Sequence, residues 1–136
     1  MYTFEETLTA PAGAAKVWEL YSDINRWPDW NEAINSAELD GPFENGATGS
    51  IQVLIAPPLG FRLENVEPGE SFDIVAGLGD LKVTMKQHLR DDGDGECTIK
   101  HTLVMEGGNQ AMLQTIGEML AASIPDSMQR LLELAA

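Results

Sequence analysis

The chain has 136 residues, of which eight are Lys or Arg and 22 are Asp or Glu, so its formal net charge is −14. This length predicts one domain, residues 1–136, and suffices to bury a core without a disulfide or a metal ion. The negative charge repels phosphate backbones and anionic lipid heads, which argues against nucleic acid and membrane surfaces as partners.

The N-terminal region predicts one strand followed by two short helices. Residues 2–9 are rich in threonine and aromatic side chains, and Ala10-Pro11 ends this strand because proline cannot donate to a ladder. Within 12–22, apolar residues recur at spacings of three and four, which is typical of a helix. Pro28 then forces a break or a restart, so a second short helical segment is expected. All three tryptophans lie in this region, at Trp18, Trp27 and Trp30.

The middle of the chain, residues 33–106, carries mainly strand and turn signals. The segment from Pro57 to Gly60 is expected to be a turn, and the acidic segment from Asp91 to Glu96 is expected to join the last two strands as a hairpin. An EF-hand calcium loop that began at Asp91 would need Glu at its twelfth position, which is Thr102, so a solvated turn is predicted instead. Strands are predicted at 51–55, 61–66, 71–76, 81–90 and 97–106.

Residues 109–135 form the longest helical pattern, with apolar side chains near a period of 3.6. Pro125 interrupts this pattern at a cost of roughly 3 kcal/mol. A kink or a break is therefore expected near residue 123, with the segment from Ser123 to Asp126 as a capping box. One strand, two short helices, about six antiparallel strands and one long helix predict an α+β domain. We expect the long helix to bury its apolar face on the concave face of the sheet.

Alternation along the strands assigns side chains to the inner face of the predicted sheet. This face is apolar apart from Glu6, Asn65, Gln87 and His101, an arrangement typical of a small-molecule pocket. A solid core in which methionines fill gaps would give the same pattern, so both interpretations stay open. The predicted ligand-binding residues are Trp18, Tyr21, Trp27, Trp30, Phe61, Leu63, Phe72, Ile74, Val83, Met85, Gln87, Ile99, His101, Leu103, Met112, Ile116, Met119 and Leu120.

The candidate catalytic residues are His101 and Glu6. His101 would polarise a carbonyl or move a proton, with Glu6 or Gln87 orienting it, although a lone inward histidine is more often a structural residue. One cysteine and two histidines predict no disulfide, no metal site and no cofactor. The sequence lacks a secretory signal and an apolar run of about 18 residues, so we expect a cytoplasmic protein without membrane insertion.

Several short motifs are spread over the whole chain: Ala10-Pro11, Val17-Trp18, Asp23-Ile24, Trp27-Pro28-Asp29-Trp30, Gly41-Pro42-Phe43 and Gly46-Ala47-Thr48-Gly49. Together with the long C-terminal helix they resemble the SRPBCC superfamily, the START/Bet v 1-like group, near its polyketide cyclase/dehydrase branch. The resemblance implies a helix-grip fold, in which a curved antiparallel sheet of about six to seven strands wraps around the C-terminal helix and two short helices follow the first strand. It also implies a cavity between sheet and helix for apolar or polyketide-like ligands, and no universal catalytic triad.

Three functions follow as hypotheses. The first is binding of a small apolar, aromatic or polyketide-like ligand between sheet and helix, by a monomer or weak dimer. The second is a cyclase or dehydratase-type enzyme that acts on such a ligand through His101. The third is a protein-interaction module, which an exposed apolar patch around Trp27, Pro28 and Trp30 would favour.

Overall fold

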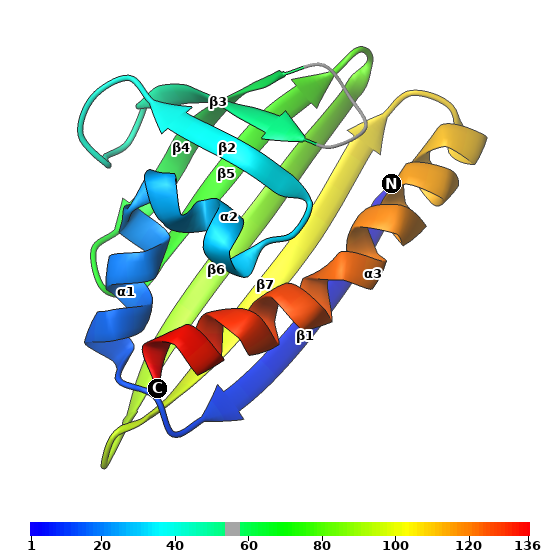
Figure 1. Ribbon diagram of the computed structural model, residues 1–136. Coiled ribbons are helices and arrows are strands. Elements are labelled where there is room, and N and C mark those ends of the chain that lie inside the picture. The colour runs from blue at the N-terminus through cyan, green and yellow to red at the C-terminus, as the bar shows by residue number, and fades with distance from the viewer. Residues whose placement is uncertain (54–57) are drawn as a thin grey trace.

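The computed structural model describes residues 1–53 and 58–136. Seven strands form one antiparallel sheet in the order β1-β7-β6-β5-β4-β3-β2, and the helices lie on one face of it (Figure 1). The prediction of an α+β helix-grip fold with two short helices after the first strand is confirmed. The elements in chain order are β1 (Tyr2–Ala10), α1 (Ala14–Ser22), the short 3-10 helix η1 (Ile24–Arg26), α2 (Trp27–Trp30), β2 (Ile34–Leu39), β3 (Thr48–Val53), β4 (Leu59–Glu67), β5 (Ser71–Leu78), β6 (Leu81–Gly93), β7 (Glu96–Gly107) and α3 (Gln110–Ala135).

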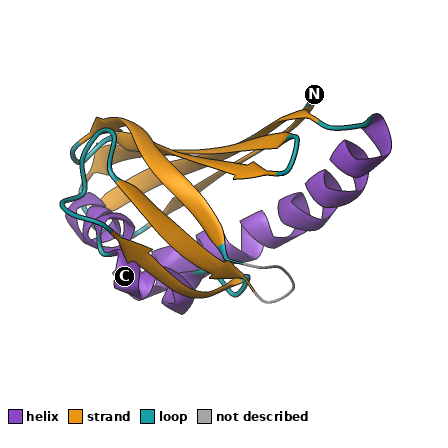
Figure 2. Cartoon of the chain, turned by 90° about the horizontal axis from the view of Figure 1, so that it is seen from above, coloured by secondary structure: helices purple, strands orange, loops and turns teal. Residues whose placement is uncertain are grey.

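The helices cover different parts of the concave face. α3 runs along β1 and β7, while α1 reaches β6 and α2 reaches β2. Viewed from above, the sheet curves over the long helix (Figure 2). A glycine in α3 permits the close approach to β1, because a Cβ on Gly117 would lie 2.5 Å from the ring of Tyr2. α3 therefore lies mainly over the edge of the sheet that β1 and β7 form.

The long helix continues through Pro125 without a break. The hydroxyl of Ser123 donates to the carbonyl of Leu120 at 2.8 Å, and that of Ser127 donates to the carbonyl of Ser123 at 2.9 Å. Ser123 therefore caps no second helix, and the predicted break and capping box are wrong. Burial of the face that includes Ala121, Ile124 and Met128 offsets the missing proline donor.

Several strand boundaries also differ from prediction. β6 and β7 are longer than expected, so only Asp94 and Gly95 separate them, both with the positive φ that tight hairpins need. Leu59 and Gly60, predicted as part of a turn, belong to β4. The strand β2 was not predicted individually. The remaining parts of the predicted segments, at residues 54–57, lie outside the described residues.

A bulge in β4 changes one inward assignment. The register of β4 against β5 shifts between Glu64 and Glu67, and Asn65 adopts a φ of 51°. Asn65 is consequently exposed, and its side-chain amide donates to the carboxylate of Asp73 at 2.8 Å. The prediction that Asn65 points inward is wrong, because alternation holds only while the register is regular. Val66 is buried instead.

Candidate functional site

The strand register places three predicted polar residues side by side on the inner face. His101 of β7 pairs with Glu6 of β1 on one side and with Gln87 of β6 on the other. Phe72 of β5 extends this row beyond Gln87. His101 and Gln87 are buried and Glu6 is half-buried. We call Glu6, His101 and Gln87 the polar row.

Tyr21 of α1 covers the centre of the polar row. Its hydroxyl is 2.8 Å from Nε2 of His101, and both side chains are buried. Burial lowers the pKa of His101 to about 3, with a smaller contribution from the charge of His88. Burial also raises the pKa of Tyr21 well above its ordinary value of 10. At neutral pH the imidazole and the phenol are therefore both uncharged.

The tryptophan region packs around Phe72 rather than forming an exposed patch. Rings of Tyr21, Trp18 and Trp27 lie 5.2, 6.0 and 6.5 Å from that of Phe72. Trp27 and Trp30 are only 1% and 3% exposed, and Nε1 of Trp27 donates to the carbonyl of Tyr21 at 2.9 Å. The exposed apolar patch that would favour a protein-interaction module is therefore not formed by these tryptophans.

Two buried side-chain atoms at or next to the polar row have no hydrogen-bond partner among the described residues. Among the described residues, Nε1 of Trp30 and Oε1 of Gln87 are the buried side-chain atoms without a hydrogen bond. The ring of Trp30 lies 6.2 Å from that of His101, and Gln87 is the neighbour of His101 in the register. Both unpaired atoms therefore belong to residues that surround His101.

Burial is incomplete in the middle of the inner face of β5 and β6, next to the polar row, although Leu81 at the start of β6 is buried. Ile74, Val83 and Met85 are half-buried, whereas Phe72 and Gln87, one step further along the same strands, are fully buried. Because alternate residues of a strand share a face, these side chains form one continuous surface. We call Ile74, Val83 and Met85 the apolar entrance.

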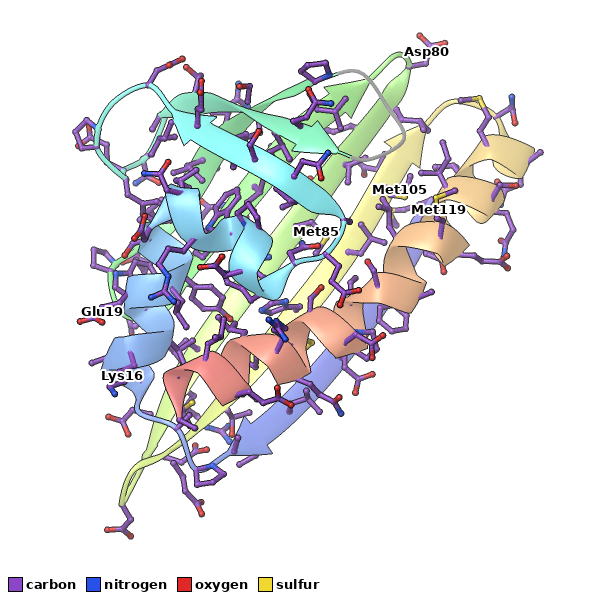
Figure 3. The ribbon with its side chains drawn as sticks, viewed as in Figure 1. Lys16, Glu19, Asp80, Met85, Met105 and Met119 are labelled. Atoms are coloured by element: carbon purple, nitrogen blue, oxygen red, sulfur yellow. The ribbon has the colours of Figure 1, made fainter. Side chains whose placement is uncertain are left out.

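The first half of α3 contributes apolar side chains that are also incompletely buried. Ile116 and Leu120 are half-buried, and Met112 and Met119 are 41% and 50% exposed. Figure 3 labels Met85 on β6, Met105 on β7 and Met119 on α3, with Met105 and Met119 close together in this view. The predicted ligand-binding residues thus fall into two sets. The incompletely buried set contains these four residues of α3, Trp18 and the apolar entrance. The buried set contains Tyr21, Trp27, Trp30, Phe61, Leu63, Phe72, Gln87, Ile99, His101 and Leu103.

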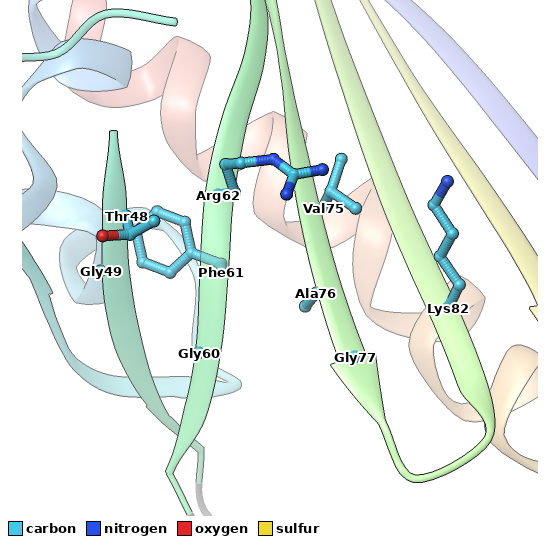
Figure 4. Close-up of a pocket in the computed structure, with 9 residues that line it drawn as sticks. All are labelled: Thr48, Gly49, Gly60, Phe61, Arg62, Val75, Ala76, Gly77 and Lys82. Atoms are coloured by element: carbon cyan, nitrogen blue, oxygen red, sulfur yellow. The ribbon is translucent and has the colours of Figure 1, made fainter. Parts of the chain in front are cut away.

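An open hollow of about 420 Å³ lies on the opposite, outer face of the sheet (Figure 4). Its lining includes Gly60 and Gly77, which have no side chain to fill it, together with Arg62 and Lys82. Of the described residues that line it, Phe61 alone belongs to the predicted ligand-binding set. Sequence reasoning missed this feature, because exposed cations on alternate strand positions look like an ordinary solvated face. Arg62 is already paired with Glu64 at 2.7 Å.

A smaller and more enclosed pocket of about 70 Å³ separates α2 from α3. Trp30 lines it together with Ser123 and Ser127, and Arg130 bridges the two helices by donating to the carbonyl of Asp29 at 2.8 Å. No sequence pattern indicates this pocket, because its two sides are about 100 residues apart in the chain.

The described residues contain no group of three or more His, Cys, Asp or Glu side chains that could hold a metal ion. Cys97 is buried, and burial raises the pKa of its thiol, so it is not an activated nucleophile. Within the same described residues, no helix has both the length and the apolar character needed to cross a membrane.

Comparison with known proteins agrees with this architecture. A family profile described as "Polyketide cyclase / dehydrase and lipid transport" matches residues 1–135. A START superfamily protein from Mycobacterium smegmatis superposes with a TM-score of 0.80 over 100% of both chains at 12% identity. A hypothetical protein from Helicobacter pylori gives a TM-score of 0.82 at 9% identity, over 99% of this chain and 88% of that one.

A third similar structure is norcoclaurine synthase from Thalictrum flavum in complex with dopamine and hydroxybenzaldehyde. Its TM-score is 0.72 at 13% identity, over 98% of this chain and 85% of that one. No curated protein sequence matches the chain. Identities this low show a shared fold, and the site must be interpreted from the residues of this chain.

Proposed function

The chain belongs to the polyketide cyclase/dehydrase and lipid transport family, and on this premise we propose that it binds a small hydrophobic or polyketide-like ligand between the sheet and α3. The observation that carries the proposal is the incomplete burial of inward apolar side chains. Ile74, Val83 and Met85 of the apolar entrance stay half-buried, and Met119 of α3 is 50% exposed. A ligand seated against them would remove this surface from water, at about 25 cal/mol per Å².

Two further features support a small-molecule ligand. Methionine is flexible and polarisable, so Met85 and Met119 can adapt their shape to an apolar partner. The polar row lies at the buried end of the apolar entrance, which resembles the usual composition of a ligand site, apolar with a few polar groups. The similar fold of norcoclaurine synthase, in complex with the small aromatic molecules dopamine and hydroxybenzaldehyde, agrees with a ligand of this size.

A hydrophobic fluorescent dye tests the proposal. The wild-type protein is expected to bind the dye, and Met119→Lys is expected to raise the Kd at least about tenfold, because a lysine ammonium would have to be desolvated beside the apolar entrance. Leu134→Lys is the matched control, since Leu134 is also an exposed apolar residue of α3, at 39% exposure, near the opposite end of the helix.

Both variants change the net charge equally, so a general electrostatic effect would alter both. Equal dye affinity in the two variants, or no dye binding to the wild type, would count against the proposed site. Native mass spectrometry of protein purified from its host would then report the mass of any ligand that is retained.

A second candidate function is a cyclase or dehydratase-type enzyme, which the uncharged Tyr21–His101 pair favours. A neutral imidazole can donate a hydrogen bond to a substrate carbonyl, and Glu6 stands next to it in the polar row. On a substrate found by screening, His101→Gln is expected to lower kcat by about 10²-fold if the neutral imidazole of His101 donates to the substrate carbonyl in the transition state. Unchanged turnover together with unchanged dye affinity would exclude His101 from the chemistry.

A further inference from the structure

We propose that Trp30 and Gln87 form a donor–acceptor pair that binds a hydroxyl group, so that the ligand of this protein is an apolar alcohol or phenol. The inference rests on the proposed binding function and names the polar group that such a ligand carries. It follows from two buried atoms that have no hydrogen-bond partner among the described residues, Oε1 of Gln87 in the polar row and Nε1 of Trp30 next to it.

Both atoms belong to side chains that are more than nine-tenths buried, at 3% and 2% exposure. Buried polar atoms nearly always have a hydrogen-bond partner. A buried donor or acceptor without one gives up its hydrogen bonds to water and forms none in the protein, which costs free energy. The described residues supply no such partner. A group that enters from outside the chain is therefore the natural partner of both atoms.

The chemistry of the two atoms is complementary. The indole nitrogen of Trp30 can only donate, and the amide oxygen of Gln87 can only accept. A hydroxyl group accepts one hydrogen bond and donates another, so one alcohol or phenol can satisfy both. A ketone or ether would leave Gln87 unpaired, and a carboxylate would place a negative charge against the acceptor oxygen of Gln87.

The neighbouring polar groups do not compete for this role. The hydroxyl of Tyr21 and Nε2 of His101 already bond to each other at 2.8 Å, which leaves Trp30 and Gln87 with the buried unpaired atoms of the cluster. Glu6 lies on the other side of His101 from Gln87 and is only half-buried. Gln87 directly follows the position of Met85 on the inner face of β6. A ligand whose apolar part covers the apolar entrance would therefore point its other end toward Gln87.

Three naphthalene derivatives of similar size, each titrated in competition with the dye, separate the contributions of the accepted hydrogen bond, the donated hydrogen bond and apolar contact. 1-Naphthol both accepts and donates, 1-methoxynaphthalene only accepts, and 1-methylnaphthalene does neither. We expect the wild type to bind 1-naphthol at least about tenfold more tightly than 1-methylnaphthalene, with 1-methoxynaphthalene between them. Two neutral hydrogen bonds are enough for such a preference.

Two variants test the assignment to residues. Gln87→Leu removes the acceptor and is expected to bring the affinity for 1-naphthol close to that for 1-methoxynaphthalene. Trp30→Phe removes the donor and is expected to reduce the preference for both oxygen-containing compounds. Gln129→Leu is the matched control for Gln87→Leu, because it removes an exposed glutamine of α3 outside the site, and its preference should equal that of the wild type.

The melting temperature of the free protein gives an independent readout. Gln87→Leu replaces an unpaired buried amide with an apolar side chain, so Tm is expected to rise by a few degrees while the preference for 1-naphthol falls. A purely structural glutamine would give a lower Tm and an unchanged preference.

The possible outcomes distinguish failure of the hydroxyl site from failure of the proposed binding function. Equal affinity of the wild type for 1-naphthol and 1-methylnaphthalene would overturn the hydroxyl site, as expected if only an internal water pairs the two atoms, and would leave apolar binding standing. Failure of all three compounds and of the dye to bind would overturn the binding function and the hydroxyl site together.

Discussion

Acidification from pH 7 to pH 4 is expected to lower the free energy of unfolding of the wild type by about 3 kcal/mol more than that of His101→Gln. In the folded protein the buried imidazole stays neutral down to about pH 3, whereas an unfolded histidine binds a proton below about pH 6.5. Between these values the unfolded state holds one more proton. The stability contributed by neutral His101 is therefore present above pH 6.5 and is lost as the pH falls toward 3.

Urea denaturation of both proteins at several pH values measures this difference. The carboxylates of the chain titrate in both proteins, so the comparison with His101→Gln removes their contribution. Glutamine keeps a polar group that can bond to the Tyr21 hydroxyl, which limits other changes at the site. If both proteins lose the same free energy between pH 7 and pH 4, the imidazole of His101 is accessible to protons in the folded state.

The residues on the inner face of the sheet could be predicted from the sequence, because the face to which a side chain points depends on its position within its own strand. A regular strand turns alternate side chains to opposite faces, so alternation alone suffices to assign Gln87, His101 and Leu103 to the inner face. The same rule failed at Asn65, where a bulge reverses the alternation. A bulge depends on how two strands pair, and one strand alone carries no signal for it.

The contacts that define the site could not be predicted, because they join distant segments. Tyr21 and His101 are 80 residues apart in the chain, and their hydrogen bond depends on how α1 is placed over β7. The unpaired state of Trp30 and Gln87 likewise appears only when every neighbour of these atoms is known. The sequence indicated that polar residues share the inner face, and the structure adds which of them are already paired.

The continuous helix α3 illustrates a competition between the local preference of proline to end a helix and the free energy gained by tertiary packing. Pro125 alone predicts a break, because it removes a backbone donor and crowds the preceding turn. Leu131 and Met128, beyond the proline, are fully buried, and Ile124 before it is also buried. A break would expose part of this face, so packing against the sheet outweighs the local preference.

Trp27→Ala is expected to lower the free energy of unfolding by about 3–5 kcal/mol, a large part of the roughly 5–15 kcal/mol typical of a domain. Trp27 is almost fully buried, its ring lies 5.5 Å from that of Phe61 and stacks on Phe72, and its indole N–H bonds to the carbonyl of Tyr21. Alanine would leave a cavity and an unpaired carbonyl at Tyr21.

Trp18→Ala is the matched control for urea denaturation, because Trp18 packs edge-on against Tyr21, Phe43 and Phe72 but is only half-buried. It should lose clearly less stability than Trp27→Ala, and equal losses would contradict the central place of Trp27 in the core.

The two variants also differ in their expected effect on the site. Trp27 holds the backbone of Tyr21, whose hydroxyl contacts His101, so Trp27→Ala is expected to weaken dye binding even under conditions where the variant remains folded. The largest of the fully buried side chains thus also positions Tyr21, whose hydroxyl contacts His101.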